Sequence, residues 1–235
     1  ILLFLYVCTI HLYVQGEYYH IFLDLASVSQ IIDNSNKRGY TGSIKHLNGG
    51  ISMRLLTVAQ LQTQVYTQKE NNLSPLDGLF CQAKDAGADM ICLPEMFSCP
   101  YETPNFPVYA EPCGGLSWQT LSGLAKRYQV YLSAGSVPES DEAGNVYNTA
   151  YVFDREGRQI AKHRKVHLFD IDVKGGQRFK ESDTLTAGDK ATVFDTEFGP
   201  MGLCICYDFR FPELARRMVL DGARVILVPA AFNMT

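Results

Sequence analysis

The segment GLCICYDFRFPEL, residues 202–214, places two cysteines at the end of an apolar run and follows them with a pattern typical of a helix start. Cys206 stands where the expected strand ends, so its thiol is predicted to lie at a sheet edge near free backbone N–H groups and the positive helix end. That environment favours a thiolate. Cys204 is expected on the same face but deeper in the strand, where a cysteine behaves as a small hydrophobic residue. Taken alone, a strand-end cysteine is more often structural, so a nucleophile needs partners.

Two other strand ends offer a base and a cation that would serve such a thiol. Glu95 follows the apolar run GADMICLP, and a carboxylate that loses water among apolar neighbours becomes a better proton acceptor. Lys165 lies in KHRKVHLFDID, where Lys162 and Arg164 are expected to be solvated. Taken alone, Glu95 and Lys165 are each compatible with an ordinary loop or surface role. Together with Cys206 they provide a nucleophile, a base and a group that stabilises an oxyanion.

The composition is that of an ordinary globular protein. The 235 residues are 46% hydrophobic and 20% charged, which is enough for one sizeable core. A formal net charge of −4 gives no electrostatic reason to bind nucleic acid or an anionic membrane, so the expected partner is a small molecule. Seven cysteines without disulfide-scaffold or zinc-site spacing favour reduced thiols in a cytoplasmic protein. His163 and His167 lack a second cluster of matching spacing, so no metal site is predicted.

The elements that must position these side chains begin at Met53. Short apolar or alternating runs bounded by Gly, Pro or Asp predict strands, and apolar residues at helical spacing predict helices. The predicted strands are residues 54–62, 89–93, 130–137, 147–154, 191–198, 201–206 and 224–232, and the predicted helices are 76–86, 117–128 and 212–221. The sequence DREG at 154–157 is typical of a hairpin turn. The pattern predicts an α/β layered fold that mixes βαβ crossovers with hairpins.

The first 52 residues do not follow this pattern. Residues 1–14 are apolar but shorter than the roughly 20 residues that a membrane helix needs, and residues 33–50 are polar and turn-rich. The chain begins without Met, whereas Met53 directly precedes the first convincing strand. Codons for the residues before Met53 can contain a purine tract like that of a bacterial ribosome-binding site. We therefore expect residues 1–52 to be a non-core extension translated from upstream sequence, and residues 53–235 to form the domain.

The segments LPEMF, HRKVHLFD and CICYDFRFPEL, in that order, resemble the Glu, Lys and Cys motifs of the nitrilase, or carbon–nitrogen hydrolase, superfamily. The resemblance runs from Met53 to Thr235. It implies a four-layer α-β-β-α sandwich around two sheets that usually pairs into homodimers or larger homo-oligomers through helices near the cysteine. Because relatives continue past the position of Thr235, the sandwich is expected to be C-terminally incomplete, and the fragment poorly stable or inactive.

The resemblance also implies a role for each matching residue. Glu95 is then the base, Lys165 the oxyanion-stabilising cation, Cys206 the nucleophile, and Glu181 in RFKESDTL the second glutamate. With the Tyr207 backbone N–H as a further oxyanion donor, an amide would be hydrolysed through a cysteine thioester with release of ammonia. This chemistry requires no metal and no organic cofactor.

Two features of the sequence indicate which branch of this superfamily the chain resembles most. Tyr207-Asp208 follows the cysteine, as in amidase branches, whereas nitrilases proper usually have Trp-Glu there. The segments HLFDID, FKESDTL, CYDFRFPELA and AFNMT look most like omega-amidases, which deamidate alpha-ketoglutaramate and alpha-ketosuccinamate. Arg178 or Arg210 is a candidate to bind the far carboxylate of such a substrate, although each is equally compatible with a structural role.

Several alternatives stay open. N-carbamoyl-amine hydrolases and deaminated-glutathione amidases share most of this signature. A non-catalytic interaction protein of the same fold is a further class. A redox sensor using Cys204 and Cys206 is less favoured, because a strand holds thiols at positions i and i+2 awkwardly for a disulfide. Ammonia release that depends on Cys206 separates the amidase from the last two.

Overall fold

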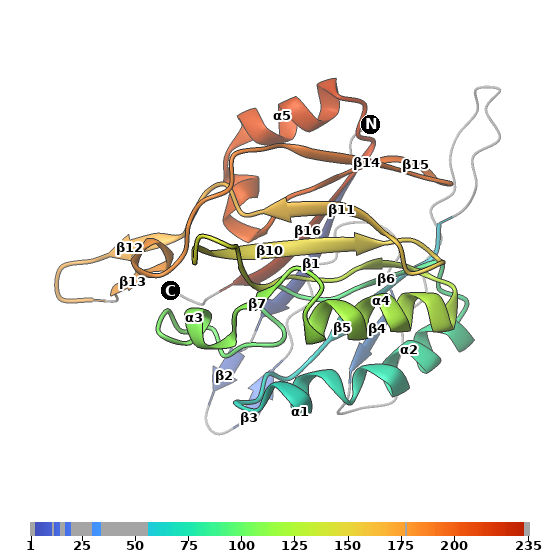
Figure 1. Cartoon of the computed structure of the whole chain (residues 1–235), viewed down its shortest axis with the longest axis horizontal. Helices are drawn as coiled ribbons and strands as arrows, with labels where there is room; N and C mark the ends of the chain where they lie inside the picture. The colour runs from blue at the N-terminus through green and yellow to red at the C-terminus, as the bar shows by residue number, and fades with distance from the viewer. Residues whose placement is uncertain are drawn as a thin grey trace.

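Two large β-sheets lie between helices (Figure 1). The computed structural model describes residues 56–176 and 178–232, together with the backbone of the strands at 3–10, 12–14, 17–19 and 30–33. In Figure 1, α5 (Pro212–Leu220) lies on one side of the molecule and α2 (Leu76–Asp85) and α4 (Leu116–Tyr128) lie on the other. The strands of both sheets run between these helices.

The first sheet has eight strands and the second has four. The eight-stranded sheet runs in the order β4 (Gln30–Asp33), β5 (Val58–Gln62), β6 (Met90–Cys92), β8 (Tyr131–Ser133), β10 (Val146–Phe153), β9 (Val137–Ser140) and β7 (Glu111–Pro112), with β11 (Gln159–Arg164) paired to β10. The four-stranded sheet runs β1 (Leu3–Ile10), β16 (Val225–Phe232), β15 (Gly199–Leu203) and β14 (Thr192–Thr196). In the eight-stranded sheet, the adjacent strands β4, β5, β6 and β8 are parallel, whereas β10 is antiparallel to β8, β9 and β11. In the four-stranded sheet, β1, β16 and β15 are parallel.

Shorter elements lie between the strands and helices named so far. They are α1 (Lys69–Leu73), α3 (Asn105–Tyr109), the hairpins β2–β3 (Leu12–Val14 and Glu17–Tyr19) and β12–β13 (Asp170–Asp172 and Arg178–Lys180), and the 3₁₀ helices η1 (Glu181–Asp183) and η2 (Cys206–Arg210). The β12–β13 hairpin projects from the body at the left of Figure 1. No helix among the described residues has the length and apolar character needed to cross a membrane.

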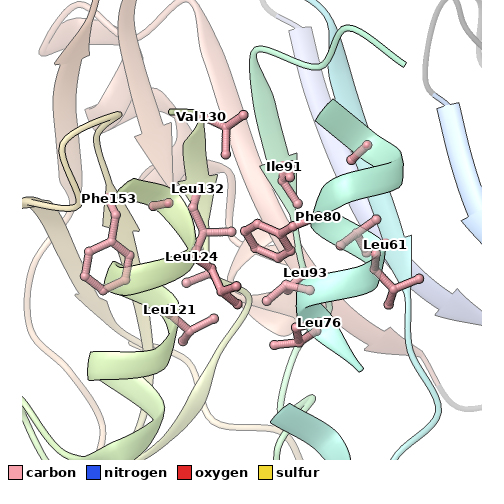
Figure 2. Close-up of a cluster of buried hydrophobic side chains, with 14 of the residues drawn as sticks. Leu61, Leu76, Phe80, Ile91, Leu93, Leu121, Leu124, Val130, Leu132 and Phe153 are labelled. Carbon is pink, nitrogen blue, oxygen red and sulfur yellow. The ribbon is translucent and has the colours of Figure 1, made fainter. Parts of the chain in front are cut away.

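Three buried clusters separate four layers. Phe80, Ile91, Leu121 and Leu132 belong to the cluster between α2, α4 and the eight-stranded sheet (Figure 2). A second cluster fills the space between the two sheets, with Met90 and Val152 from one and Leu203 and Leu227 from the other. A third lies between α5 and the four-stranded sheet and includes Leu214, Met218 and Ile226. The four-layer α-β-β-α sandwich is therefore confirmed.

The helices form where apolar residues recur at helical spacing. In α2 the buried residues Leu76, Leu79, Phe80 and Ala83 follow positions i, i+3, i+4 and i+7, so they line one face. In α5, Pro212 occupies the first turn, where its missing N–H costs nothing, and the chain ends the helix before Gly222 at φ +104°. These local signals explain why the three predicted helices are confirmed within one residue at each end.

Three predicted strands differ from the structure. In the described part of the run 54–62, a strand forms only from Val58, as β5. The run 130–137 is two strands, β8 and β9, because Gly135 at φ +60° turns the chain between them. The run 201–206 is a strand only to Leu203, where its pairing with β14 and β16 ends, and Cys206 at φ +42° then leaves the extended conformation. The hairpin turn at 154–157 is confirmed, since β10 and β11 pair antiparallel on either side of it.

The backbone of the first 52 residues contributes strands that the sequence analysis did not predict. β1 pairs with β16 in parallel, and β4 pairs with β5. The side chains of residues 1–55 lie outside the described part of the structure. The domain boundary after Ser52 therefore stays a prediction.

Gly135 provides a test of how the fold positions Glu95. A Cβ atom at this position would lie 2.1 Å from the Pro94 carbonyl oxygen, directly before Glu95, and the φ of +60° disfavours any side chain. We expect Gly135→Ala to lower the free energy of unfolding by about 2 kcal/mol or more, because backbone strain and overpacking add. Urea denaturation measures this change.

The matched control is Gly123→Ala. Gly123 lies inside α4, and its added Cβ would meet nothing within 4 Å. Because alanine is the better helix former, this variant should be neutral or stabilised by up to about 1 kcal/mol. Equal stability of the two variants would contradict the close packing of Gly135 against the Glu95 segment.

Candidate active site

Four predicted site residues meet at the ends of different elements. Glu95 follows β6, Lys165 follows β11, Glu181 opens η1 and Cys206 opens η2. The Lys165 Nζ atom lies 2.9 Å from Glu95 Oε1 and 3.0 Å from Glu181 Oε1. The Cys206 thiol is near enough for the charges of Glu95 and Lys165 to act on it. All four side chains are buried, so the structure assembles one compact polar cluster from distant parts of the sequence.

The Glu95 carboxylate is held by donors on both oxygens. Oε1 accepts hydrogen bonds from Asn148 Nδ2 at 2.8 Å and Lys165 Nζ at 2.9 Å, and the Tyr101 hydroxyl oxygen lies 3.1 Å from it. Oε2 accepts a hydrogen bond from the Ala231 backbone N–H at 2.9 Å. Glu95 is only 3% exposed. These four contacts fix the carboxylate in one orientation beside the thiol.

Lys165 is a completely buried cation between two anions. Burial opposes its charge, but the charges of Glu95 and Glu181 outweigh burial and raise the pKa of the Lys165 ammonium above its usual range. Its backbone is fixed as well, because the Lys165 N–H donates to the Asn148 carbonyl and the Gly188 N–H donates to the Lys165 carbonyl. Lys165 therefore remains protonated and stabilises negative charge; it is not a base.

Glu181 is the second anion on this lysine. Its Oε1 also accepts a hydrogen bond from Tyr101 Oη at 2.6 Å, and its Oε2 accepts one from the Phe169 N–H at 2.7 Å. Burial raises the pKa of the Glu181 carboxyl, the charge of Lys165 opposes this, and the charge of Glu95 adds to it. The direction is upward, as two neighbouring carboxylates in a buried site require.

The Cys206 thiol differs from its predicted state. Burial raises its pKa, the charge of Glu95 raises it further, and Lys165 compensates only in part. The expectation that this environment favours a thiolate is therefore wrong: desolvation and a neighbouring anion outweigh the helix end, which belongs here to a single short 3₁₀ helix. The thiol is protonated at rest and needs a base.

Cys204 does not share a face with Cys206. Cys204 packs with Leu214 and Met218 under α5, whereas Cys206 belongs to the cluster between the sheets. The prediction of a common face is wrong because the strand ends at Leu203 and the left-handed backbone of Cys206 redirects its side chain. Sharp, strained turns of this kind are common at functional positions.

Tyr207 offers a backbone donor next to the thiol. Its N–H lies in the first turn of η2, where a helix leaves N–H groups without intrahelical acceptors. No hydrogen bond from this N–H is found among the described residues. The Tyr207 ring packs edge-to-face on Phe169 and Phe211, with centroid distances of 5.1 and 5.4 Å.

The two predicted carboxylate-binding arginines lie apart from the cluster. Arg178 Nη1 lies 2.9 Å from Asp183 Oδ2 on the exposed β12–β13 side. Arg210 is exposed, and its guanidinium lies 5.1 Å from the centroid of the Phe209 ring. Neither makes a described contact with Glu95 or Cys206.

Two residues of the cluster were missed by sequence reasoning. Tyr101 contacts both carboxylates, and nothing in its neighbourhood PYETP separates it from an ordinary loop tyrosine. Asn148 did carry a signal, because an amide inside the apolar strand VYNTAYVF needs a buried partner, and that partner is Glu95.

Asp208 fastens the turn of the thiol to the segment that carries Lys165. Its carboxylate accepts hydrogen bonds from the backbone N–H groups of Ile205 at 3.0 Å, Val166 at 3.1 Å and His167 at 2.8 Å. It also contacts His163 Nε2 at 3.0 Å and His167 Nδ1 at 2.9 Å. Both histidines thus contact one carboxylate, and among the described residues no group of three or more His, Cys, Asp or Glu side chains is arranged so that it could hold a metal ion.

We expect Asp208→Ala to lower the free energy of unfolding by about 3–5 kcal/mol, because it leaves several buried donors without an acceptor. The control Asp221→Ala removes an exposed partner of Arg217 and should change stability by less than about 0.5 kcal/mol. Urea denaturation compares the two. Similar midpoints would show that Asp208 does not fasten these segments.

Comparison with known proteins gives one family. The carbon–nitrogen hydrolase family model matches residues 55–235. The omega-amidase NIT2 of Bos taurus is 46% identical over 183 residues, covering 78% of this chain and 66% of that protein. Nitrilase homolog 2 of Dictyostelium discoideum is 40% identical over 217 residues, covering 88% of this chain and 66% of that protein. The chain thus spans slightly less than two thirds of the length of these relatives.

Solved structures agree. Nit3 of Saccharomyces cerevisiae, a member of branch 10 of the nitrilase superfamily, has a TM-score of 0.66 and 37% identity, covering 73% of this chain and 62% of that one. A variant of the amidase from Nesterenkonia sp. AN1 has a TM-score of 0.59 and 25% identity, covering 74% of this chain and 65% of that one. In that variant, acrylamide has added to the active-site cysteine.

Proposed function

Because the chain belongs to the carbon–nitrogen hydrolase family, we propose that it is an amidase that cleaves a small, carboxylate-bearing amide and releases ammonia. The observation that carries the proposal is the buried contact of the Lys165 ammonium with Glu95 beside the Cys206 thiol. A nucleophile, a base and a cation for the oxyanion are the groups that thiol-based amide hydrolysis needs. The cysteine adduct of the Nesterenkonia amidase variant supports the same nucleophile.

The first half of the reaction forms a thioester. Cys206 Sγ attacks the amide carbon while Glu95 accepts the thiol proton, which the raised thiol pKa makes necessary. The Lys165 ammonium and the Tyr207 N–H stabilise the oxyanion of the tetrahedral intermediate. Glu95 then gives its proton to the departing nitrogen, and ammonia leaves.

The second half hydrolyses the thioester. Glu95, again a carboxylate, removes a proton from a water molecule that attacks the acyl carbon, and the same two donors stabilise the second oxyanion. When this intermediate collapses, the Cys206 thiolate leaves and recovers the proton from Glu95. Glu181 holds the Lys165 ammonium in place throughout, which the contact at 3.0 Å supports.

The omega-amidase branch is proposed from the relatives. Omega-amidases of Bos taurus and Mus musculus are both 46% identical to this chain. Arg178 and Arg210 stay the proposed partners of the substrate carboxylate. Arg178 would have to release the Asp183 carboxylate before it could bind the substrate. Six free cysteine side chains in the described part support the proposed reducing, cytoplasmic compartment. We propose assembly as a homodimer from the family resemblance alone.

The nucleophile is tested by two cysteine variants. Cys206→Ala should reduce ammonia release by at least about a thousandfold, because no other group forms the thioester. Cys204→Ala should retain most turnover, because Cys204 packs under α5 rather than in the cluster. Circular dichroism establishes that both variants fold. Turnover in the Cys206 variant together with its loss in a folded Cys204 variant would refute the assignment.

The substrate is tested with three compounds: alpha-ketoglutaramate, N-carbamoylputrescine and a simple aliphatic nitrile. We expect alpha-ketoglutaramate to have the highest kcat/KM for ammonia release. A carbamoylase would instead prefer the ureido compound and also release carbon dioxide. A tenfold preference for either other compound, about 1.4 kcal/mol of transition-state discrimination, would exclude the omega-amidase assignment and leave Glu95, Lys165 and Cys206 in their roles.

A further inference from the structure

Tyr101 contacts the same two carboxylate oxygens as Lys165. Its hydroxyl oxygen lies 2.6 Å from Glu181 Oε1 and 3.1 Å from Glu95 Oε1, while the Lys165 ammonium lies 3.0 and 2.9 Å from these atoms. Two donors therefore share two acceptors at the centre of the site. The proposed mechanism assigns no task to Tyr101.

We propose that Tyr101 is a positioning residue that keeps the Glu181 carboxylate ionised against Lys165, so that Glu95 is the carboxylate that takes up the Cys206 proton. The proposal rests on the proposed function of these residues and adds a cause for the different roles of the two glutamates.

The two distances support an unequal hydrogen bond. A phenol carries one hydrogen, so Tyr101 donates to one carboxylate at a time. The contact of 2.6 Å with Glu181 is in the range of strong charge-assisted O–H···O⁻ bonds, and the contact of 3.1 Å with Glu95 is longer than such bonds. Tyr101 therefore donates its hydroxyl hydrogen mainly to the Glu181 carboxylate.

The cluster needs such a donor because two buried carboxylates share one lysine. Burial and the charge of Glu95 promote protonation of Glu181, whereas Lys165, Tyr101 and the Phe169 N–H oppose it. A proton on Glu181 would leave Glu95 as the sole anion paired with Lys165. Glu95 would then be a weaker base for the thiol, because its negative charge would be compensated more completely.

Tyr101 is suited to this task in protonation and in orientation. Burial and the charges of Glu95, Glu181 and Cys206 raise the pKa of the phenol well above its usual range, so it keeps its hydrogen. The ring stacks on Phe179 at a centroid distance of 5.6 Å and an interplanar angle of 14°. Because these ring contacts do not involve the hydroxyl, phenylalanine at position 101 retains the packing.

The test measures carboxamidomethylation of Cys206 by iodoacetamide as a function of pH, followed by mass spectrometry of the Cys206 peptide in the intact chain. The sulfur forms a bond to the methylene carbon, iodide leaves, and the thiol proton goes to Glu95. The reaction needs no amide turnover, so a failure of the proposed amidase activity is seen separately, in the ammonia assay. The acid limb is the part of the pH profile where the alkylation rate falls as the pH is lowered. Tyr101→Phe should move this limb to a higher pH by roughly one unit.

The direction of this pH shift follows from the loss of the Tyr101 hydroxyl as a hydrogen-bond donor. Without the hydroxyl the carboxylate pair takes up its first proton at a higher pH, so base-assisted alkylation begins at a higher pH. The matched control is Tyr147→Phe, which removes a phenol–carboxylate hydrogen bond of 3.1 Å to Asp141 away from the cluster. It should leave the acid limb in place.

A second variant tests whether Tyr101 acts through Glu181. In the Glu181→Gln background, adding Tyr101→Phe should shift the acid limb by less than half of the shift seen in the unmodified chain. An unmoved acid limb in Tyr101→Phe overturns the proposal. The same shift in both backgrounds also overturns it, because Tyr101 would then act directly on Glu95.

Discussion

The buried ammonium of Lys165 holds the candidate site together through its contacts with Glu95 and Glu181. An ammonium without solvent contact is costly, and the cost is met only when anions and further donors surround it with good geometry. Here Glu95 and Glu181 provide the anions, at 2.9 and 3.0 Å. The three residues come from separate connecting segments, so no one segment can take its native place without the others. The Ala231 N–H of β16, which donates to Glu95 Oε2, connects this cluster to the four-stranded sheet as well.

This requirement explains the unusual backbone around the cluster. Met96, directly after Glu95, has a φ of +51°, and Cys206 has a φ of +42°, both in the left-handed region that non-glycine residues rarely adopt. Close backbone contacts also flank the segment that carries Lys165. A Cβ on Gly188 would lie 2.2 Å from the Arg164 carbonyl oxygen, directly before Lys165. Left-handed backbone and close backbone packing thus occur together around the site.

The sequence predicts the repeating elements well and the irregular ones poorly. Helices such as α2 and α5 follow from apolar spacing and from Pro and Gly at their ends, which are local signals. The turn at Cys206 is not local in origin: Asp208, held by donors from the Lys165 segment, fastens it across 42 positions to Val166. The resting protonation of the thiol was missed for the same reason, because its pKa is set by burial and by Glu95, neither of which is visible in the neighbouring sequence. The order of the motifs predicted a common site for Glu95, Lys165, Glu181 and Cys206. The part played by Tyr101 and Asn148 in this site was recognised only in the structure.

The protonated resting state of Cys206 has a consequence for oxidative damage. Hydrogen peroxide attacks thiolates, and a thiol that keeps its proton is a slow target for conversion to sulfenic acid. Because the raised pKa comes from burial and from the Glu95 charge, this resistance is a property of the folded site. At equal exposure, a low-pKa thiol would thus be oxidised before Cys206.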